Sequence, residues 1–385
     1  MVDTTSGPLT GAARPIAGVA ADLAAEMTER RRIDADLVKA MRAAGFMRHF
    51  VPARYGGAAG TFTDLLEAVA ALGEACPATA WCASLFASTP RFVPCFPEAG
   101  QREFWAGGPD TAFVCSVLPF GEAAPDGDGL RVSGRWPYMS AVEYADWVIV
   151  CAKLPGAGGP RPTLVAVPVS AVSVEDTWDT VGMRATGSNT VVLDEVHVPA
   201  SRIVDRAVVF GGRLVDGPGA PEATRIAPLA AVNGLTFVVP ALGAAQGALA
   251  ELARHLGPKL RNVSPTPGLP GPGGTLTSQE MTLARSAAEI DSARLLLTRI
   301  AQLADTQGPF TSLTVARNVR DSAFAVDLLV TAVNRIFRGA GTGGQAAHGP
   351  LERFWHDVNA VATHQALQFE PAAHTYARAL LTTDT

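Results

Sequence analysis

A block of strand-like segments lies between two regions of helical spacing, and this order restricts the fold more than any other feature of the chain. From about residue 112 to residue 203, short β-rich runs alternate with Gly, Pro and Asp turns, a pattern typical of a small barrel or sandwich. On both sides of the block, apolar residues recur every three or four positions, which indicates amphipathic helices. An α+β fold is therefore expected.

At 385 residues the chain is long for one hydrophobic core, so two or three compact units are expected. The order of helical, β and helical segments divides it into three parts. Residues 1–110 are assigned to an N-terminal α-helical domain, 111–222 to a central β-barrel domain and 223–385 to a C-terminal four-helix bundle. A connector rich in Gly and Pro, Gly211 to Glu222, precedes the bundle. The bundle helices are expected in four segments: Ile226–Leu256, Leu276–Ala304, Leu313–Phe337 and Leu351–Leu381.

Composition narrows the classes of function. The formal net charge of -5 gives no electrostatic reason to expect nucleic acid or an anionic membrane as a partner. Five cysteines without C-x-x-C spacing indicate reduced thiols, and the N-terminus lacks the features of a signal peptide, so a cytoplasmic location is expected. Ala227–Ala250 is apolar enough to suggest a membrane span, but Pro240 and many small residues favour a buried bundle helix.

Several catalytic classes lack their motifs. The seven histidines include no H-E-x-x-H pattern and no carboxylate-rich cluster, so no metal site is expected. The sequence also lacks G-x-S-x-G, G-x-G-x-x-G and the phosphate-loop motif. Hydrolase, Rossmann and nucleotide-triphosphatase functions therefore have no support.

Two motifs in the central block carry candidate chemistry. Val132–Val150 reads VSGRWPYMSAVEYADWVIV, with a turn expected at Ser133 and Gly134 and a buried strand from Trp147 to Cys151. Val181–Pro199 reads VGMRATGSNTVVLDEVHVP, a loop rich in Gly, Ser and Thr that opens into an alternating strand. The two motifs predict neighbouring strands with a polar loop at one end, an arrangement that suits the wall of a cofactor site.

These motifs resemble the acyl-CoA dehydrogenase superfamily, and more narrowly its branch of two-component flavin-dependent monooxygenases. The resemblance rests on G-R-W-x-x-x-S followed by A-D-W, and on G-M-R-x-T-G-S-x-T before a strand that ends in V-P. It extends over nearly the whole chain and implies the superfamily's domain order and a homotetramer, a dimer of dimers. It also implies a reduced flavin, FADH2 or FMNH2, supplied by a separate NAD(P)H:flavin reductase.

The resemblance implies contacts around the flavin. Trp136 packs near the ring, Ser140 hydrogen-bonds its reactive edge near N5, and Ser116 faces the same cavity. The residues themselves also allow a core role for Trp136 and a turn role for Ser140. Arg261 follows the first bundle helix, where the family often places a phosphate-binding arginine, but it is the weakest parallel because the sequence after it departs from the family's R-x-x-F-G pattern. The residues themselves also allow Arg184, Thr186 and Ser188 to cap their loop, and Gly341 and Gly343 to form an ordinary turn that ends a helix. The remaining cofactor contacts implied are Tyr138, Arg184, Thr186, Ser188, Gly341 and Gly343.

The superfamily's catalytic carboxylate is missing. Acyl-CoA dehydrogenation needs a carboxylate to accept the substrate α-proton. By comparison with the family, its two usual positions fall at Gln365 and near Asn233, and neither residue is an acid. The resemblance therefore implies a monooxygenase that forms a flavin C4a-hydroperoxide, which must be kept dry. Ser140 would slow its decay and His364 would supply or relay a proton, since imidazole titrates near working pH; a bundle histidine without a catalytic role is the alternative.

The expected substrate is a small aromatic compound or a natural-product intermediate, hydroxylated at carbon or nitrogen. ATAWCASLFAS, Ala78 to Ser88, resembles a helix near the active site of this branch, although a plain core helix fits it equally well. The substrate contacts implied are Trp81, Phe86, Gln365 and Asn233. Two other functions stay open: an FAD-dependent acyl-CoA dehydrogenase-type desaturase with an unrecognised base, and a flavin-free binding or scaffold homologue.

Overall fold

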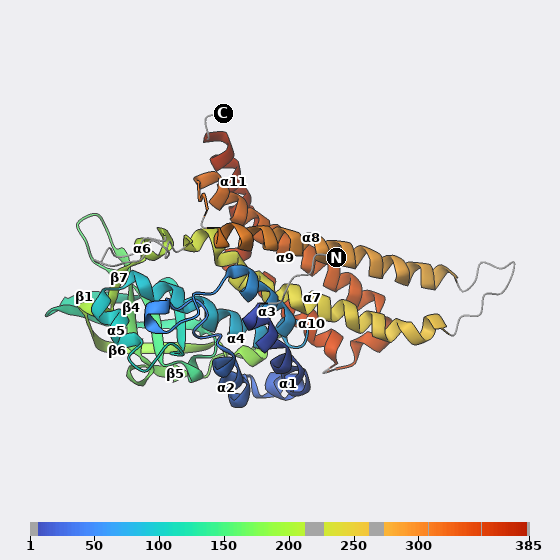
Figure 1. Cartoon of the computed structure of the whole chain (residues 1–385), viewed down its shortest axis with the longest axis horizontal. Helices are drawn as coiled ribbons and strands as arrows, with labels where there is room; N and C mark the ends of the chain where they lie inside the picture. The colour runs from blue at the N-terminus through green and yellow to red at the C-terminus, as the bar shows by residue number, and fades with distance from the viewer. Residues whose placement is uncertain (1–6, 212–226, 262–272, 307, 348, 383–385) are drawn as a thin grey trace.

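The computed structural model describes residues 7–211, 227–261, 273–306, 308–347 and 349–382. Helices form the first and last parts of the chain and one mixed sheet lies between them (Figure 1), which confirms the expected α+β fold. The expected connector Gly211–Glu222 lies almost entirely outside the described residues.

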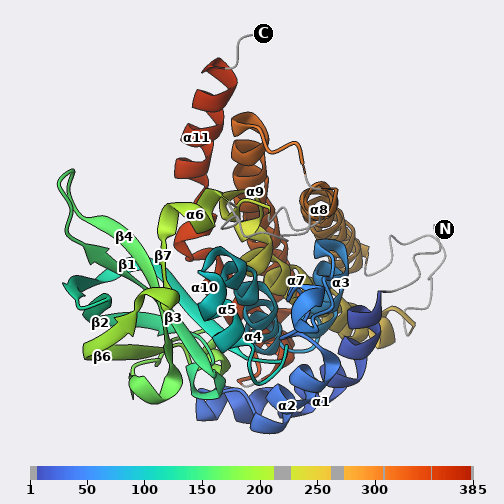
Figure 2. The same ribbon diagram turned by 60° about the vertical axis from the view of Figure 1, so that its left-hand side comes forward.

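The N-terminal part consists of helices that pack beside the bundle and the sheet (Figure 2). α1 ends where Arg31 adopts a left-handed conformation, and the Asp34 carboxylate then caps α2 by accepting from the Asp36 and Leu37 amides. The expected helical character of this part of the chain is confirmed. Their bounds are α1 (Pro8–Arg30), α2 (Ala35–Ala44), η1 (Ala53–Tyr55), α3 (Phe62–Gly73), α4 (Pro77–Ser88), η2 (Thr89–Cys95) and α5 (Glu98–Phe104).

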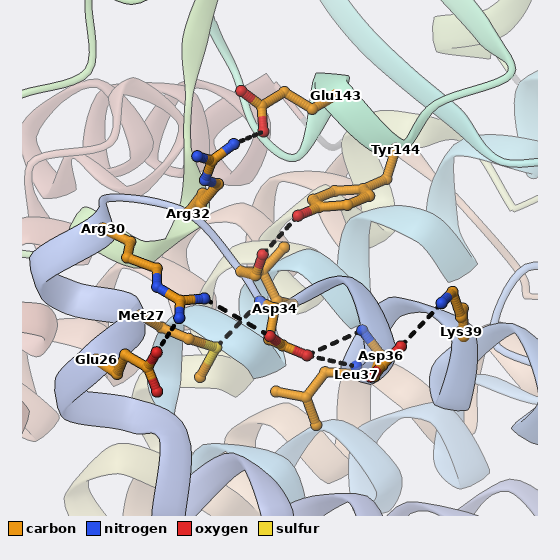
Figure 3. Close-up of polar contacts among 11 residues, drawn as sticks. Glu26, Met27, Arg30, Arg32, Asp34, Asp36, Leu37, Lys39, Glu143 and Tyr144 are labelled. Carbon is orange, nitrogen blue, oxygen red and sulfur yellow. Dashed lines mark hydrogen bonds and ion pairs between the residues drawn. The ribbon is translucent and has the colours of Figure 1, made fainter.

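The turn between α1 and α2 holds a loop of the sheet region in place (Figure 3). The Tyr144 hydroxyl donates to the Ile33 carbonyl at 2.7 Å, and Arg32 pairs with Glu143 at 3.5 Å. Both partners belong to η3 (Val142–Tyr144), which begins two residues after Ser140. The N-terminal helices therefore help to position the segment that carries the serine.

The described residues form one sheet of seven strands in the order β5-β6-β2-β1-β3-β4-β7. β1 and β3 are parallel, whereas the other pairs are antiparallel. β5 and β7 each have one neighbour among the described strands, so the expected barrel is an open sheet with two edges. The strands are β1 (Phe113–Asp126), β2 (Gly129–Met139), β3 (Trp147–Leu154), β4 (Arg161–Pro168), β5 (Ser173–Glu175), β6 (Asn189–Pro199) and β7 (Ile203–Asp205).

The expected turn at Ser133 and Gly134 is wrong, because both residues lie inside β2. The buried Trp136 ring occupies the space between β1 and β2, and a Cβ at Gly134 would lie 2.5 Å from the Gly121 Cα. Glycine is needed here for close packing rather than for a turn. The chain reverses instead around Gly127, whose φ of +62 is in the left-handed region.

The bundle begins with α7 (Leu229–Arg261), α8 (Gly273–Asp305) and α9 (Ser312–Gly339), which run side by side away from the sheet (Figure 1). α7 passes close to α9, because a Cβ at Gly234 would lie 2.1 Å from the Ser322 Oγ. α7 is long and apolar enough to cross a membrane, yet 72% of its most apolar window is buried inside the protein. It has the character of a core helix.

The fourth expected helix, Leu351–Leu381, is wrong in one respect: it breaks near His364. α10 (Pro350–Ala362) is followed by η8 (Gln365–Leu367) and then α11 (Phe369–Thr382), which projects from the body of the molecule (Figure 1). Pro371 lies in the first turn of α11, where its missing N–H is tolerated, but inside a longer helix it would clash with the preceding turn. The break places His364 at the N-cap of η8 instead of on a helix face.

Candidate functional site

A chain of hydroxyl groups lies where the β2 end meets the loop before β6. The Ser140 Oγ is 2.7 Å from the Ser188 Oγ, which is 2.6 Å from the Thr186 Oγ1. The Trp81 Nε1 donates to Ser140 at 3.0 Å, and Thr186 donates to the Met183 carbonyl at 2.8 Å. Ser140, Thr186 and Ser188 are almost completely buried. The structure thus brings together Ser140, Thr186 and Ser188, which were expected to contact the cofactor, with Trp81, which was expected to contact the substrate.

Both ends of this chain fix the direction of every proton in it. An indole N–H can only donate and a carbonyl oxygen can only accept, whereas each hydroxyl has one proton. Thr186 gives its proton to Met183, so it accepts from Ser188, and Ser188 in turn accepts from Ser140. Ser140 also accepts from Trp81. It therefore retains one free lone pair and no free proton for a ligand.

Three aromatic rings from different elements gather beside Ser140. The imidazole of His364 stacks on the Phe237 ring at a centroid distance of 3.9 Å and an interplanar angle of 29°. The Trp81 indole meets Phe237 at 5.2 Å and His364 edge-on at 5.8 Å. All three side chains are partly buried. The rings of α4, α7 and the loop before η8 thus form one aromatic cluster, Trp81–Phe237–His364.

His364 is neutral in this environment. Its Nδ1 accepts from the Ala366 amide at 3.2 Å, which leaves the proton of the neutral ring on Nε2. Burial lowers the pKa of His364 to about 4, and no charged group among the described residues offsets this effect. The expectation that this imidazole titrates near working pH is wrong for the chain by itself, because desolvation penalises the cation. Nε2 can still serve as a hydrogen-bond donor.

Backbone strain concentrates around the hydroxyl chain. Among the described residues, six other than glycine have positive φ, and three of them, Tyr138, Ala141 and Met183, flank Ser140 and Thr186. A bulky residue such as Tyr138, at φ 68, is uncommon in this region. Such strain persists where the surrounding structure over-determines it, often at functional sites. Here the Ala141 amide donates to the Thr186 carbonyl at 2.8 Å, which ties the two segments together.

Two of the expected contacts lie in the hydrophobic core. Trp136 and Phe86 have no exposed surface, and the Trp136 Nε1 donates to the Cys151 carbonyl at 2.7 Å. A side chain without exposed surface offers no face to a ring or substrate. The structure thus favours the core alternative for Trp136 and a plain core position for Phe86.

Three other expected contacts take no part in the hydrogen bonds of the hydroxyl chain. The Arg184 guanidinium donates to Asp179 at 2.8 Å and to the Thr180 carbonyl at 2.6 Å, so it holds its own loop. Tyr138 is 68% exposed and meets Trp178 edge-on at 6.1 Å. Ser116 is half-buried in β1, beside a register shift against β3. Tyr138 is accessible to a ligand or partner, whereas Arg184 is engaged within the protein.

The expected phosphate and glycine contacts are separate from the aromatic cluster. Arg261 is the last residue of α7, and its side chain lies outside the described part of the structure. Gly341 and Gly343 are exposed in η7 (Gly341–Gln345), between α9 and α10. Gly341 has a φ of +64 and open space around it, as a ligand-facing turn or an ordinary one would have.

The two positions expected for a catalytic base lie at the edges of the cluster. Asn233 is partly buried one helical turn before Phe237, and Gln365 is exposed directly after His364. Phe237 itself was missed by the sequence analysis. The signal was available, since residues four apart on a helix share a face and Asn233 was already a candidate. No group of three His, Cys, Asp or Glu side chains suited to a metal occurs among the described residues.

The residues at this site fit a flavin in part. An aromatic cluster with directed polar groups suits a flat ring that has a polar edge. Ser140, Ser188 and Thr186 supply that polar edge, and the neutral His364 supplies an N–H without a charge. The expected phosphate contact is Arg261, whose side chain lies outside the described part of the structure, so the described residues bear only on the fit of the flavin ring.

Comparison with known proteins identifies the family. Residues 11–101 match the family described as "Acyl-CoA dehydrogenase, N-terminal domain", and residues 235–369 match "Acyl-CoA dehydrogenase, C-terminal domain". The oxygenase component of FADH(2)-dependent resorcinol hydroxylase from Rhizobium sp. (strain MTP-10005) is 30% identical over 377 residues, 94% of this chain and 91% of that protein.

Two solved structures agree with this result. The 3-HSA hydroxylase from Rhodococcus sp. RHA1 has a TM-score of 0.90 at 24% identity and covers 99% of this chain and 98% of that one, which shows the shared fold. XiaF from Streptomyces sp., in complex with FADH2 and glycerol, has a TM-score of 0.87 at 27% identity and covers 98% and 95%. The chain therefore belongs to the acyl-CoA dehydrogenase superfamily, in its branch of flavin-dependent monooxygenase oxygenase components.

Proposed function

We propose that this chain hydroxylates a small aromatic substrate with a reduced flavin, FADH2 or FMNH2, delivered by a separate NAD(P)H:flavin reductase. The observation that carries the proposal is the directed hydroxyl chain that ends at Ser140 beside the aromatic cluster. A flavin bound there would supply the activation of dioxygen. The protein's own residues would bind and orient the ring and exclude water from it.

The direction of the hydroxyl chain favours a reduced flavin. A reduced ring carries an N–H at N5, whereas the oxidised ring has a bare acceptor nitrogen there. Ser140 gives its proton to Ser188 and has only a lone pair free, so it can accept from a reduced ring but cannot donate to an oxidised one. We assign Ser140 to this contact, with Ser188 and Thr186 as the groups that set its orientation.

His364 is assigned to the substrate side of the ring. Its Nε2–H is free to donate, because Nδ1 is engaged by the Ala366 amide. A neutral donor can hold a phenol or phenolate oxygen and pass a proton in a dry site, although it is not a cation at neutral pH. Trp81 and Phe237 contribute apolar walls on which an aromatic substrate can stack. The relative named a resorcinol hydroxylase favours this substrate class.

The decisive experiment compares flavin affinities under anaerobic conditions. Wild type and the Ser188→Ala variant are each titrated with oxidised and reduced FAD and FMN. In the variant, Ser140 has lost its acceptor and is free to donate to a ligand. Wild type is expected to prefer reduced flavin, and Ser188→Ala should narrow the preference by about tenfold, the effect of one hydrogen bond. Equal preference in both proteins would overturn the assigned role of Ser140.

Three assays on the same protein distinguish the alternative functions. A monooxygenase consumes oxygen with externally reduced flavin and forms a hydroxylated aromatic product. A dehydrogenase-type desaturase would reduce bound FAD with an acyl thioester in the absence of oxygen. A scaffold homologue would bind no flavin in either redox state. Oxidation at carbon rather than nitrogen is favoured by the hydroxylase relatives and is read from the product by mass spectrometry.

Assembly and location complete the proposal. We expect a homotetramer, a dimer of dimers, in the cytoplasm, with no membrane or nucleic acid as a partner. The exposed glycines of η7, Gly341 and Gly343, would face the cofactor of a neighbouring subunit, and Tyr138 and Ser116 would line the cofactor side. Sedimentation at micromolar concentration measures the assembly, and a monomer would remove the basis for the η7 contact.

A further inference from the structure

A buried carboxylate on α10 reaches the loop that carries the hydroxyl chain. Asp357 is 6% exposed, and its Oδ1 accepts from the Met183 amide at 2.5 Å. The two residues are 174 positions apart in the chain. A charge-assisted bond to a backbone amide is short and roughly twice as strong as a neutral one. This contact joins the bundle directly to the loop before β6.

The backbone of Met183 is the point where the hydroxyl chain is anchored. Its amide is held by Asp357, while its carbonyl accepts from the Thr186 hydroxyl at 2.8 Å and from the Trp178 indole at 3.0 Å. The Met183 backbone is left-handed, with φ 55, which is unfavourable for this residue. The carbonyl belongs to the peptide unit after the one that carries this amide, so the two groups are linked through the φ and ψ angles of Met183. Without a partner for its amide, Met183 could leave its left-handed conformation and move the carbonyl away from Thr186. The direction of protons as far as Ser140 therefore depends on the conformation of Met183.

The neighbouring glycine shows that the loop is fitted to α10. A Cβ at Gly182 would lie 2.3 Å from the His356 carbonyl oxygen, closer than side chains tolerate. On the other side, the Arg184 Nε donates to the Thr28 carbonyl of α1 at 3.3 Å. The loop is held between α1 and α10, and the Asp357 contact is its charged attachment to α10.

The charged and titratable groups around Asp357 come from α10 and from the start of α4. Arg353 favours its ionised form and Glu352 opposes it, while the buried Cys76 thiol lies close by. Glu352 is itself paired with His356 at 3.2 Å. Burial raises the pKa of Asp357 to about 6, against the lowering effect of the Met183 hydrogen bond. The carboxylate is therefore ionised at neutral pH and becomes protonated in mildly acidic solution.

We propose that Asp357 is a positioning residue: its carboxylate fixes the backbone conformation of Met183 and thereby keeps the Ser140 hydroxyl turned toward Ser188. The inference rests on the proposed function in one respect, namely that Ser140 meets the flavin. The attachment of the loop by Asp357 can be measured without any flavin, so the two claims can fail separately.

The first test is amide hydrogen exchange of residues 183–188 in the full-length protein at pH 8. Asp357→Ala is expected to speed this exchange by about 10- to 100-fold, the effect of losing a hydrogen bond to a charged group. Asp357→Asn keeps an acceptor oxygen and should remain within a few-fold of wild type. Asp327→Asn serves as control, because burial also raises the pKa of Asp327, which lies on α9. Unchanged exchange in Asp357→Ala would overturn the proposal.

The second test uses the ratio of affinities for reduced and oxidised flavin. If Asp357 orients the hydroxyl chain, Asp357→Ala lowers this ratio of affinities by about tenfold. In a Ser188→Ala background the hydroxyl chain is already interrupted, so adding Asp357→Ala should not change the ratio further. A purely structural role would weaken both affinities equally and leave the ratio unchanged, which would contradict positioning. If wild type binds neither flavin, the proposed function fails, while the exchange result still decides the loop attachment.

Discussion

The imidazole of His364 stacks on the ring of Phe237 with centroids 3.9 Å apart, although the two residues lie 127 positions apart in the chain. Burial keeps the imidazole neutral, and the hydrogen bond from the Ala366 amide fixes its tautomer. The relationship makes the protonation state of a candidate catalytic group depend on a bundle phenylalanine.

Replacing Phe237 by alanine should raise the pKa of His364 from about 4 toward its ordinary value of 6.5, because water would reach the ring. The measurement is NMR of protein with ¹³C-labelled histidine, and the signal is assigned by its loss in His364→Gln. As pH falls, His364 becomes protonated in the unfolded chain at a higher pH than in the folded protein. The free energy of unfolding therefore decreases as pH falls from about 6.5 to about 4. A wild-type pKa near 6.5 would contradict the assignment.

Asp357 should act on stability in the opposite direction. Its pKa is raised from 3.8 to about 6, so the folded state holds the proton more tightly than the unfolded chain does. Relative to Asp357→Asn, wild type is therefore expected to lose up to roughly 3 kcal/mol of unfolding free energy as pH rises from about 4 to about 6, with no further change above that range. Urea unfolding of both proteins at several pH values measures the difference. A difference that does not vary with pH would show an ordinary pKa.

Replacing Trp81 by phenylalanine keeps a ring in the aromatic cluster but removes the N–H that donates to Ser140. We expect release of hydrogen peroxide per oxygen consumed to increase several-fold, because Ser140 is less firmly held, with a loss of about 1 kcal/mol in stability. Trp105→Phe is a matched control: the Trp105 Nε1 is buried and has no partner in the described structure. That variant should be neutral or slightly more stable, so equal effects of the two substitutions would argue against the Ser140 contact.

Replacing Asp305 by alanine should destabilise the attachment of the N-terminal helices to the bundle. Its carboxylate, at the end of α8, accepts from the Phe62 amide at 2.6 Å and from the Thr63 amide at 3.0 Å, and so satisfies the start of α3. The expected cost is about 1–2 kcal/mol, as for the loss of an N-cap. Thermal unfolding measures it, with the exposed Asp291→Ala on the same helix as control. Equal melting temperatures for the two variants would show that this cap is unimportant.

The sequence by itself determined the order of helices, sheet and bundle, because hydrophobic periodicity is a local property of the chain. It also placed Ser140, Ser188, Thr186, Trp81 and His364 among the candidates, since their motifs are local as well. The sequence patterns did not predict features that depend on packing between distant elements. Trp136 faces the core although alternation allowed either face, and the helix expected through His364 breaks before Pro371.

Only the tertiary structure decided which of these side chains meet. The Trp81–Ser140 bond spans 59 positions and the Met183–Asp357 bond spans 174, and no local pattern encodes a pairing at such separation. The low pKa of His364 and the raised pKa of Asp357 have the same origin, because burial by distant elements removes the water that would stabilise their charges. Local motifs therefore identified most residues of the site, whereas the packing of distant elements set the directions of their hydrogen bonds and their charge states.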